Sequence, residues 1–103
     1  MLVERTTFQA KYGKSDALID LIRTFAKEFA PRAGIPVPKV YTDLTGTMFQ
    51  VIWDQEYRDA ADHAEGAKKR EAMFSDPAWQ QWFAKMEPLV ESGDRRLLNV
   101  VPL

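Results

Sequence analysis

The first third of the chain carries a strand-like segment followed by a helical apolar stripe. Residues 2–10 are rich in β-branched and aromatic side chains, which predicts a strand that ends in a turn at Tyr12-Gly13. Ser15 stands where an N-cap belongs, and the helix that it opens must end before Pro31, the first of three prolines in a stiff connector. The apolar stripe of this helix consists of Leu18, Leu21, Ile22, Phe25 and Phe29.

Two short apolar segments in the middle of the chain predict a β-hairpin. They cover residues 39–45 and 47–53 and would turn near Thr45-Gly46. The first is clearly more apolar on one side, whereas the second is apolar on both sides apart from Gln50. A strand with two apolar sides is typical of the covered centre of a sheet.

The last part of the chain predicts two helices and a strand. The first helix starts near Tyr57 and cannot run through Asp76, because a residue before proline disfavours helical torsions. Its inner stripe consists of Tyr57, Ala60, Ala61, Ala64, Ala67 and Lys68. Asp76 as N-cap and Pro77 as first residue open the second helix, which bends at Pro88 and ends at Gly93. Its apolar face consists of Trp79, Trp82, Phe83, Met86 and Val90, and residues 95–101 form the final strand.

The resulting order, β-α-β-β-α-α-β, predicts a single α+β domain over residues 1–103. Right-handed crossovers give a four-stranded antiparallel sheet with the helices on one face, a ferredoxin-like plait. The other face would carry apolar residues from the first, third and fourth strands, more than a monomer usually exposes. A second copy packed sheet against sheet would cover them, so we expect a homodimer.

Composition narrows the classes of function. The net charge of −1 gives no electrostatic footprint for nucleic acid or an anionic membrane, and no apolar run is long enough to span a bilayer. The absence of cysteine excludes disulfides and thiolate chemistry. The N-terminus lacks the basic and apolar pattern of an export signal, and we expect a cytoplasmic protein without nucleic-acid or membrane partners.

Three motifs carry a family resemblance over essentially the full length. They are Val51-Ile52-Trp53-Asp54, the run Phe74-Ser75-Asp76-Pro77-Ala78-Trp79, and Leu89-Val90-Glu91-Ser92-Gly93. With the order of elements, they resemble the dimeric α+β barrel superfamily, and within it NIPSNAP-like domains. The superfamily also contains cofactor-independent antibiotic-biosynthesis-type monooxygenases, haem-degrading monooxygenases and stress-responsive barrel proteins. The resemblance implies a dimeric barrel fold but selects none of these activities.

His63 is the weak catalytic candidate. It is the only histidine, the one side chain that titrates near neutrality. Trp53 and His63 are similar to a strand-end tryptophan and helical histidine of the related monooxygenases. The spacing is one residue longer, which turns His63 by about 100° around its helix. We therefore favour a partly exposed structural histidine.

The resemblance also argues against haem chemistry. Matching Ser75-Asp76 to the haem-degrading relatives places Trp82 where they have a ligating histidine, and tryptophan cannot ligate iron. The first strand, from Leu2 to Phe8, also lacks the asparagine that they use. We expect no cofactor and no metal.

Trp53, Gln50 and Arg5 are the ligand-binding candidates. Three tryptophans could wall a pocket for a flat or acyl ligand, but Trp79 and Trp82 at helical spacing favour core packing, whereas Trp53 ends a strand. Polar strand residues such as Arg5 and Gln50 would face a dimer interior, where they need a partner or a ligand.

Other charged residues favour structural roles. For Glu4 a cross-strand ion pair with an arginine is the favoured interpretation. The run Lys68-Lys69-Arg70 predicts a solvated helix face.

Three functions stay open from the sequence. The leading hypothesis is a homodimeric barrel that binds a hydrophobic or aromatic small molecule. The second is a cofactor-independent monooxygenase for a phenolic substrate, with His63 and Trp53 near the site. The third is a structural or interaction module.

Overall fold

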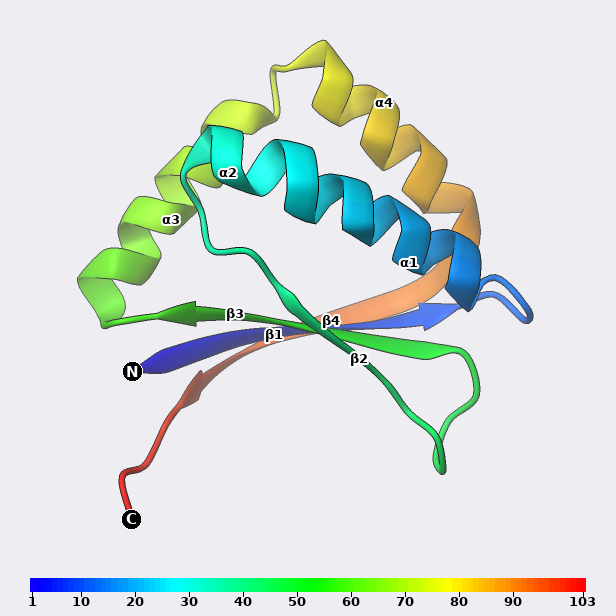
Figure 1. Cartoon of the computed structure of the whole chain (residues 1–103), viewed down its shortest axis with the longest axis horizontal. Helices are drawn as coiled ribbons and strands as arrows, with labels where there is room; N and C mark the ends of the chain where they lie inside the picture. The colour runs from blue at the N-terminus through cyan, green and yellow to red at the C-terminus, as the bar shows by residue number, and fades with distance from the viewer.

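The computed structural model describes residues 1–103 and shows one four-stranded antiparallel sheet with every helix on the same face (Figure 1). The strand order is β2-β3-β1-β4. The strands are β1 (Leu2–Ala10), β2 (Lys39–Thr42), β3 (Gln50–Tyr57) and β4 (Val90–Asn99). The predicted α+β ferredoxin-like plait is therefore confirmed, with β3 in the centre as expected. No helix is long and apolar enough to cross a membrane.

The main core lies between the sheet and the first helix. The helices are α1 (Ser15–Thr24), a π-helical segment (Phe25–Phe29), α2 (Ala30–Ala33), α3 (Ala60–Met73), α4 (Pro77–Met86) and a 3₁₀ turn (Glu87–Leu89). Leu18, Ile22 and Phe25 are at most 1% exposed and pack on the sheet, where Ala10 and Val51 are equally buried. Ser15 is the first helical residue, with Lys14 as N-cap and no side-chain cap, which corrects the predicted cap.

The first helix runs past Pro31, contrary to the prediction. The π-helical segment directly before it widens the turn, and the Ala30 N–H bonds the Phe25 carbonyl five residues back. In a regular helix Pro31 would lack an N–H donor, and its ring would clash with the carbonyl four residues back. The wider π-helical turn changes the hydrogen-bond pattern at this point, so the helix can continue. Gly34, with a φ of 72°, then ends the helix at Ala33 in the left-handed conformation.

The hairpin has a shorter first arm and a longer loop than predicted, and its second arm begins and ends later along the chain. The Asp43 carboxylate accepts the backbone N–H groups of Thr45 and Gly46 at 2.8 and 2.7 Å, which turns the chain out of the ladder after Thr42. Phe49 has a φ of 58°, and β3 begins only at Gln50.

In the second half of the chain, the boundary between β3 and α3 also differs from the prediction, whereas the start of α4 agrees with it. Tyr57 ends β3, because it continues the strand alternation, and Asp59 caps α3 by accepting the Asp62 N–H at 2.8 Å. Asp76 as N-cap and Pro77 as first residue of α4 are confirmed, with the Asp76 carboxylate accepting the Ala78 N–H at 2.9 Å.

Helix α4 does not bend at Pro88 but stops at Met86. The 3₁₀ turn that contains Pro88 leads directly into β4, so Val90 and Gly93 are strand residues rather than helical ones. Gly93 pairs with Phe8, whose ring would lie 3.3 Å from a Cβ at that position. A small residue therefore suits the strand there, and β4 begins five residues earlier than predicted and ends at Asn99.

Candidate ligand-binding site

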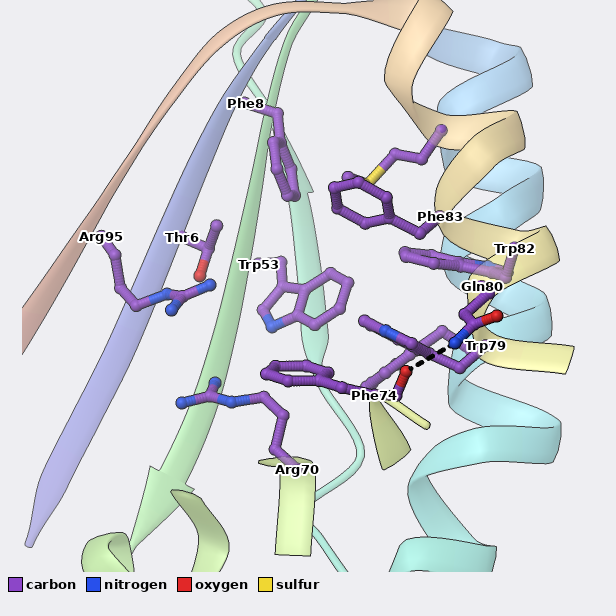
Figure 2. A pocket seen from close by; sticks show the side chains of 12 residues that line it. Thr6, Phe8, Trp53, Arg70, Phe74, Trp79, Gln80, Trp82, Phe83 and Arg95 are labelled. Atoms are coloured by element: carbon purple, nitrogen blue, oxygen red, sulfur yellow. Dashed lines mark hydrogen bonds between the residues drawn. The ribbon is translucent and has the colours of Figure 1, made fainter. Parts of the chain in front are cut away.

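A cavity of about 590 Å³ opens between the sheet and the second pair of helices, α3 and α4 (Figure 2). Strands β1, β3 and β4 form one wall, and α4 with the end of α3 forms the other. Eight of the twelve lining residues are hydrophobic, and all eight are aromatic except Met86. The lining consists of Thr6, Phe8, Phe25, Trp53, Arg70, Phe74, Trp79, Gln80, Trp82, Phe83, Met86 and Arg95.

The aromatic wall is fixed by contacts within the core. Trp79 and Trp82 stack with ring centroids 5.0 Å apart, and Phe25 lies 4.7 Å from Trp53. The Trp82 indole N–H donates to the Leu21 carbonyl at 2.8 Å, which ties α4 to α1. Core packing of Trp82 is thus confirmed, yet Trp79 and Trp82 also face the cavity. One set of rings serves both packing and the cavity.

The Trp53 ring is held from behind by a buried amide. Its indole N–H donates to Gln55 Oε1 at 3.2 Å, and Gln55 Nε2 donates to the Pro36 carbonyl at 2.7 Å. Gln55 is 2% exposed, so this chain of bonds is shielded from water. The indole plane is therefore preorganised beside the cavity.

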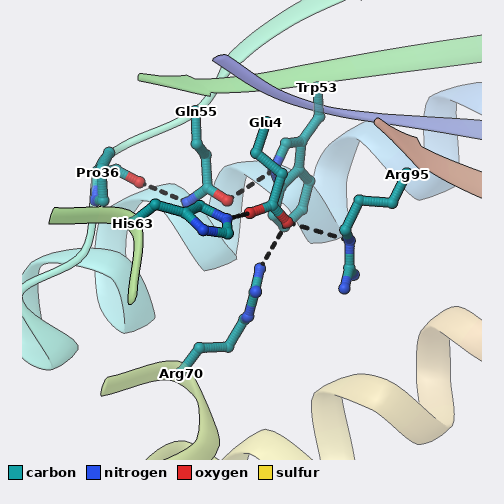
Figure 3. A network of polar contacts seen from close by, with 7 residues as sticks. All are labelled: Glu4, Pro36, Trp53, Gln55, His63, Arg70 and Arg95. Carbon is teal, nitrogen blue, oxygen red and sulfur yellow. Dashed lines mark hydrogen bonds and ion pairs between the residues drawn. The ribbon is translucent and has the colours of Figure 1, made fainter. Parts of the chain in front are cut away.

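The polar end of the cavity is a charged cluster around Glu4 (Figure 3). Glu4 is 2% exposed, and its Oε2 contacts His63 Nε2 at 2.7 Å. Its Oε1 accepts from Arg70 Nη1 at 2.9 Å and lies 3.1 Å from Arg95 Nε. The predicted cross-strand pair of Glu4 with an arginine is confirmed by Arg95. We call these four residues the Glu4 cluster.

Glu4 is held as a carboxylate by its neighbours. Burial, the largest single influence, would raise the pKa of Glu4. The hydrogen bonds from Arg70 and His63, together with the charges of Arg70 and Arg95, outweigh it, and the pKa lies below the usual value. The Tyr57 pKa is raised by burial and by the nearby Glu4 charge. Glu4 therefore stays ionised at neutral pH.

The Glu4 cluster also sets the rotation of α3, which was predicted wrongly. The expected alanine face is turned outward, with Ala60, Ala61 and Ala64 exposed. Gly66 is buried instead and lies directly against the Tyr57 ring. A Cβ at this position would be only 2.6 Å from that ring. Alanine burial contributes little, whereas an unpaired buried carboxylate is costly, so the helix turns its polar residues inward.

The structure places the predicted site residues at three locations. Trp53 lines the cavity, and His63 reaches it only through Glu4, with 25% of its side chain exposed. Arg5 and Gln50 lie on the opposite face of the sheet, because strand residues alternate between faces. There Arg5 donates two hydrogen bonds to the Asp54 carboxylate, each 2.9 Å long.

Arg70 and Arg95 were missed as site residues. The sequence predicts Arg70 in a solvated basic run, but the residue is turned inward, and its side chain is only 20% exposed. The signal was the seven-residue spacing from His63 to Arg70, which puts both on one helix face. Arg95 is opposite Thr6 in the ladder, a pairing that no local pattern revealed.

The fold and the site define a small ferredoxin-like α+β domain with an aromatic cavity between its sheet and its second pair of helices. The chain belongs to the NIPSNAP family, whose model matches residues 3–103. No functionally curated protein matches the sequence.

Solved structures share this fold over nearly the whole chain. An uncharacterised NIPSNAP domain protein from Burkholderia xenovorans has a TM-score of 0.78 at 22% identity, covering 98% of this chain and 95% of that one. A NIPSNAP family protein from Agrobacterium tumefaciens has a TM-score of 0.79 at 23% identity, covering 97% and 92%. An antibiotic biosynthesis monooxygenase has a TM-score of 0.67 at 13% identity, covering 99% and 100%. Likeness at these identities shows the fold alone.

Proposed function

We propose that this protein binds an apolar, aromatic small molecule in the cavity between the sheet and α4. The observation that carries the proposal is the cavity itself: about 590 Å³, with hydrophobic side chains at eight of twelve lining positions. Ligand sites are typically concave and apolar with a few convergent polar groups, and this volume lies in their usual range. The site lies within one chain, on the helix side of the sheet, rather than between two sheets.

The mouth of the cavity supports the same function. Phe74 and Phe83 line it, yet their exposed fractions are 51% and 46%. Rings left this open are available to a flat ligand, because aromatic pairs favour stacked or edge-to-face contact. All three tryptophans of the chain line the cavity as well, so a bound fluorophore would lie beside every one of them.

The test is a titration with N-phenyl-1-naphthylamine, a neutral naphthalene fluorophore. We expect its emission to rise on binding, with energy transfer from the tryptophans. Phe83→Glu should weaken binding by roughly tenfold or more, since it places a carboxylate against apolar rings. Ala84→Glu, on the same helix but outside the cavity lining, is the matched control and should bind as wild type. Equal binding by both variants, or none by wild type, would refute the proposal.

The Glu4 cluster favours cofactor-independent oxygenation of a phenol as a second candidate. Two guanidinium groups beside the cavity would stabilise an ionised phenol, and Glu4 connects them to His63. Oxygen uptake with hydroxyquinols and anthrones tests this function. Uptake by wild type and loss in His63→Ala would support it, whereas no uptake in either protein counts against it.

We also propose that the protein is a homodimer. The sheet face away from the helices presents Val3, Ile52 and Leu98 from three strands, and Tyr41 on β2 is 47% exposed there. Strand β4 is a ten-residue edge whose residues after Val90 are all exposed. Long uncovered edges and apolar faces are normally protected by a partner. Light scattering should give twice the 11.8 kDa chain mass, and a monomer at micromolar concentration would contradict this.

A further inference from the structure

The Glu4 cluster holds one more positive charge than its own carboxylate neutralises. Arg70 and Arg95 both approach the same oxygen, Glu4 Oε1, at 2.9 and 3.1 Å. The other oxygen, Oε2, contacts His63. Even without counting His63, two guanidinium groups face one carboxylate. A single further anion at this point would balance the charge.

Both arginines have hydrogen-bond donors to spare on the cavity side. A guanidinium has five N–H donors, and Arg70 engages Glu4 through Nη1 only, while Arg95 approaches it through Nε. The side chain of Arg95 is 59% exposed, so its terminal nitrogens remain open to a ligand. Both side chains line the cavity opposite the aromatic wall, as Figure 2 shows.

A third polar group lies at the same end. Thr6 is 7% exposed, lines the cavity and stands opposite Arg95 in the β1–β4 ladder. Its hydroxyl makes no hydrogen bond within the chain, although no fully buried side-chain atom is left unsatisfied. The hydroxyl therefore reaches the cavity space, where it can donate to or accept from a ligand.

We propose that the ligand is an aromatic anion. Its rings lie against Trp53 and Trp79, and its acidic group, such as a carboxylate or ionised phenol, binds Arg95 and Arg70 beside Thr6. This assignment rests on the proposed function, since it names the ligand class of the same cavity. Planar guanidinium groups suit such acids, because they donate two parallel hydrogen bonds. The Glu4 carboxylate fixes both arginines in place before the ligand arrives, with His63 behind it.

A pair of fluorophores with the same rings tests the charge preference directly. 1-Anilinonaphthalene-8-sulfonate is the sulfonated counterpart of N-phenyl-1-naphthylamine. Wild type should bind the sulfonate more tightly, and Arg95→Gln should weaken its binding roughly fivefold while leaving the neutral probe unchanged. Raising the salt concentration should weaken the binding of the sulfonate but not that of the neutral probe. Arg95→Lys keeps the positive charge but loses the paired donors of the guanidinium. Its affinity for the sulfonate should fall between those of wild type and Arg95→Gln.

Arg96→Gln is the matched control, because Arg96 is the next residue on β4 and faces the other side of the sheet. It removes the same charge and should bind both probes as wild type. If Arg95→Gln and Arg96→Gln weaken the sulfonate equally, or neither does, the anion assignment is wrong while the apolar site stands. If wild type binds neither probe, the proposed function itself fails. Unchanged thermal melting of each variant shows that the comparison concerns folded protein.

Discussion

Helix α1 with its π-helical extension and the pair α3 and α4 cover the same sheet face, but with very different packing. The first segment buries Leu18, Ile22, Phe25 and Phe29 to 4% exposure or less. The second pair buries only Gly66, Met73 and Trp82 over a longer length of helix. The cavity lies under the second pair, between the aromatic side chains of α4 and the sheet.

The difference separates stability from binding within one small domain. Close packing under α1 supplies the hydrophobic free energy that holds the sheet. The loosely packed half then leaves aromatic rings and the Glu4 cluster facing a space of ligand size. Substitutions should therefore have different effects in the two halves. Those in the first half should reduce stability, and those in the second should reduce ligand binding.

The largest expected effect is on the packed half. Leu18→Ala removes a side chain with 0% exposure, and we expect the free energy of unfolding to fall by about 3 kcal/mol. Phe83→Ala, at 46% exposure in the cavity wall, should cost about 1 kcal/mol or less. Urea denaturation at one fixed protein concentration measures both. Equal losses would show that α4 packs as tightly as α1.

Glu4→Gln should cost about 2 kcal/mol at neutral pH, because it removes a buried acceptor of charged hydrogen bonds. The folded pKa of Glu4 lies below its ordinary value of 4.5. The carboxylate's contribution is therefore complete above that pH and is lost as pH falls through the folded pKa. The difference between wild type and Glu4→Gln should shrink in acid. A difference that grows as pH falls would contradict the charged cluster.

Gly66→Ala should destabilise the protein by about 1 kcal/mol, although alanine normally stabilises a helix over glycine. The added Cβ would lie 2.6 Å from the Tyr57 ring, so α3 or the ring must move. In a Tyr57→Leu background the same substitution should become stabilising, because the obstructing ring is gone. Thermal unfolding of the four proteins tests this reversal. A stabilising effect in both backgrounds would mean that α3 does not rest on Tyr57.

The smallest effect concerns the corner between α3 and α4. Asp76 caps α4 through Oδ1 and pairs with Arg32 through Oδ2 at 2.9 Å. Asp76→Ala should lower the free energy of unfolding by about 1 kcal/mol, mostly through the lost cap. Asp76→Ser keeps a capping oxygen and should recover most of that loss, because the Arg32 pair is exposed and contributes little. No recovery with serine would assign the effect to the ion pair.

The sequence was sufficient where the signals were local. The strand at residues 2–10, the Asp76-Pro77 helix start and the central place of the third strand follow from propensity, capping and two-sided apolarity. The passage of the first helix through Pro31 was missed, since it depends on a π turn that no residue pattern marks.

The site was harder to predict because its parts are distant in sequence. Glu4 meets His63 and Arg70 across separations of 59 and 66 residues, and these contacts decide which face of α3 is buried. The weak alanine stripe suggested the wrong face, and with it a solvated Arg70. Trp53 was a candidate because the sequence predicts it at a strand end, although β3 continues to Tyr57, whereas Arg95 required the strand register.

We expect the ligand to bind in the loosely packed half of the domain, between the sheet and α4. A crystal structure of the protein grown with 1-anilinonaphthalene-8-sulfonate tests it most directly. We expect the rings between Trp53 and α4 and the sulfonate within hydrogen-bond distance of Arg95. An empty cavity, with the probe bound instead on the sheet face that carries Arg5 and Gln50, would contradict binding between the sheet and α4.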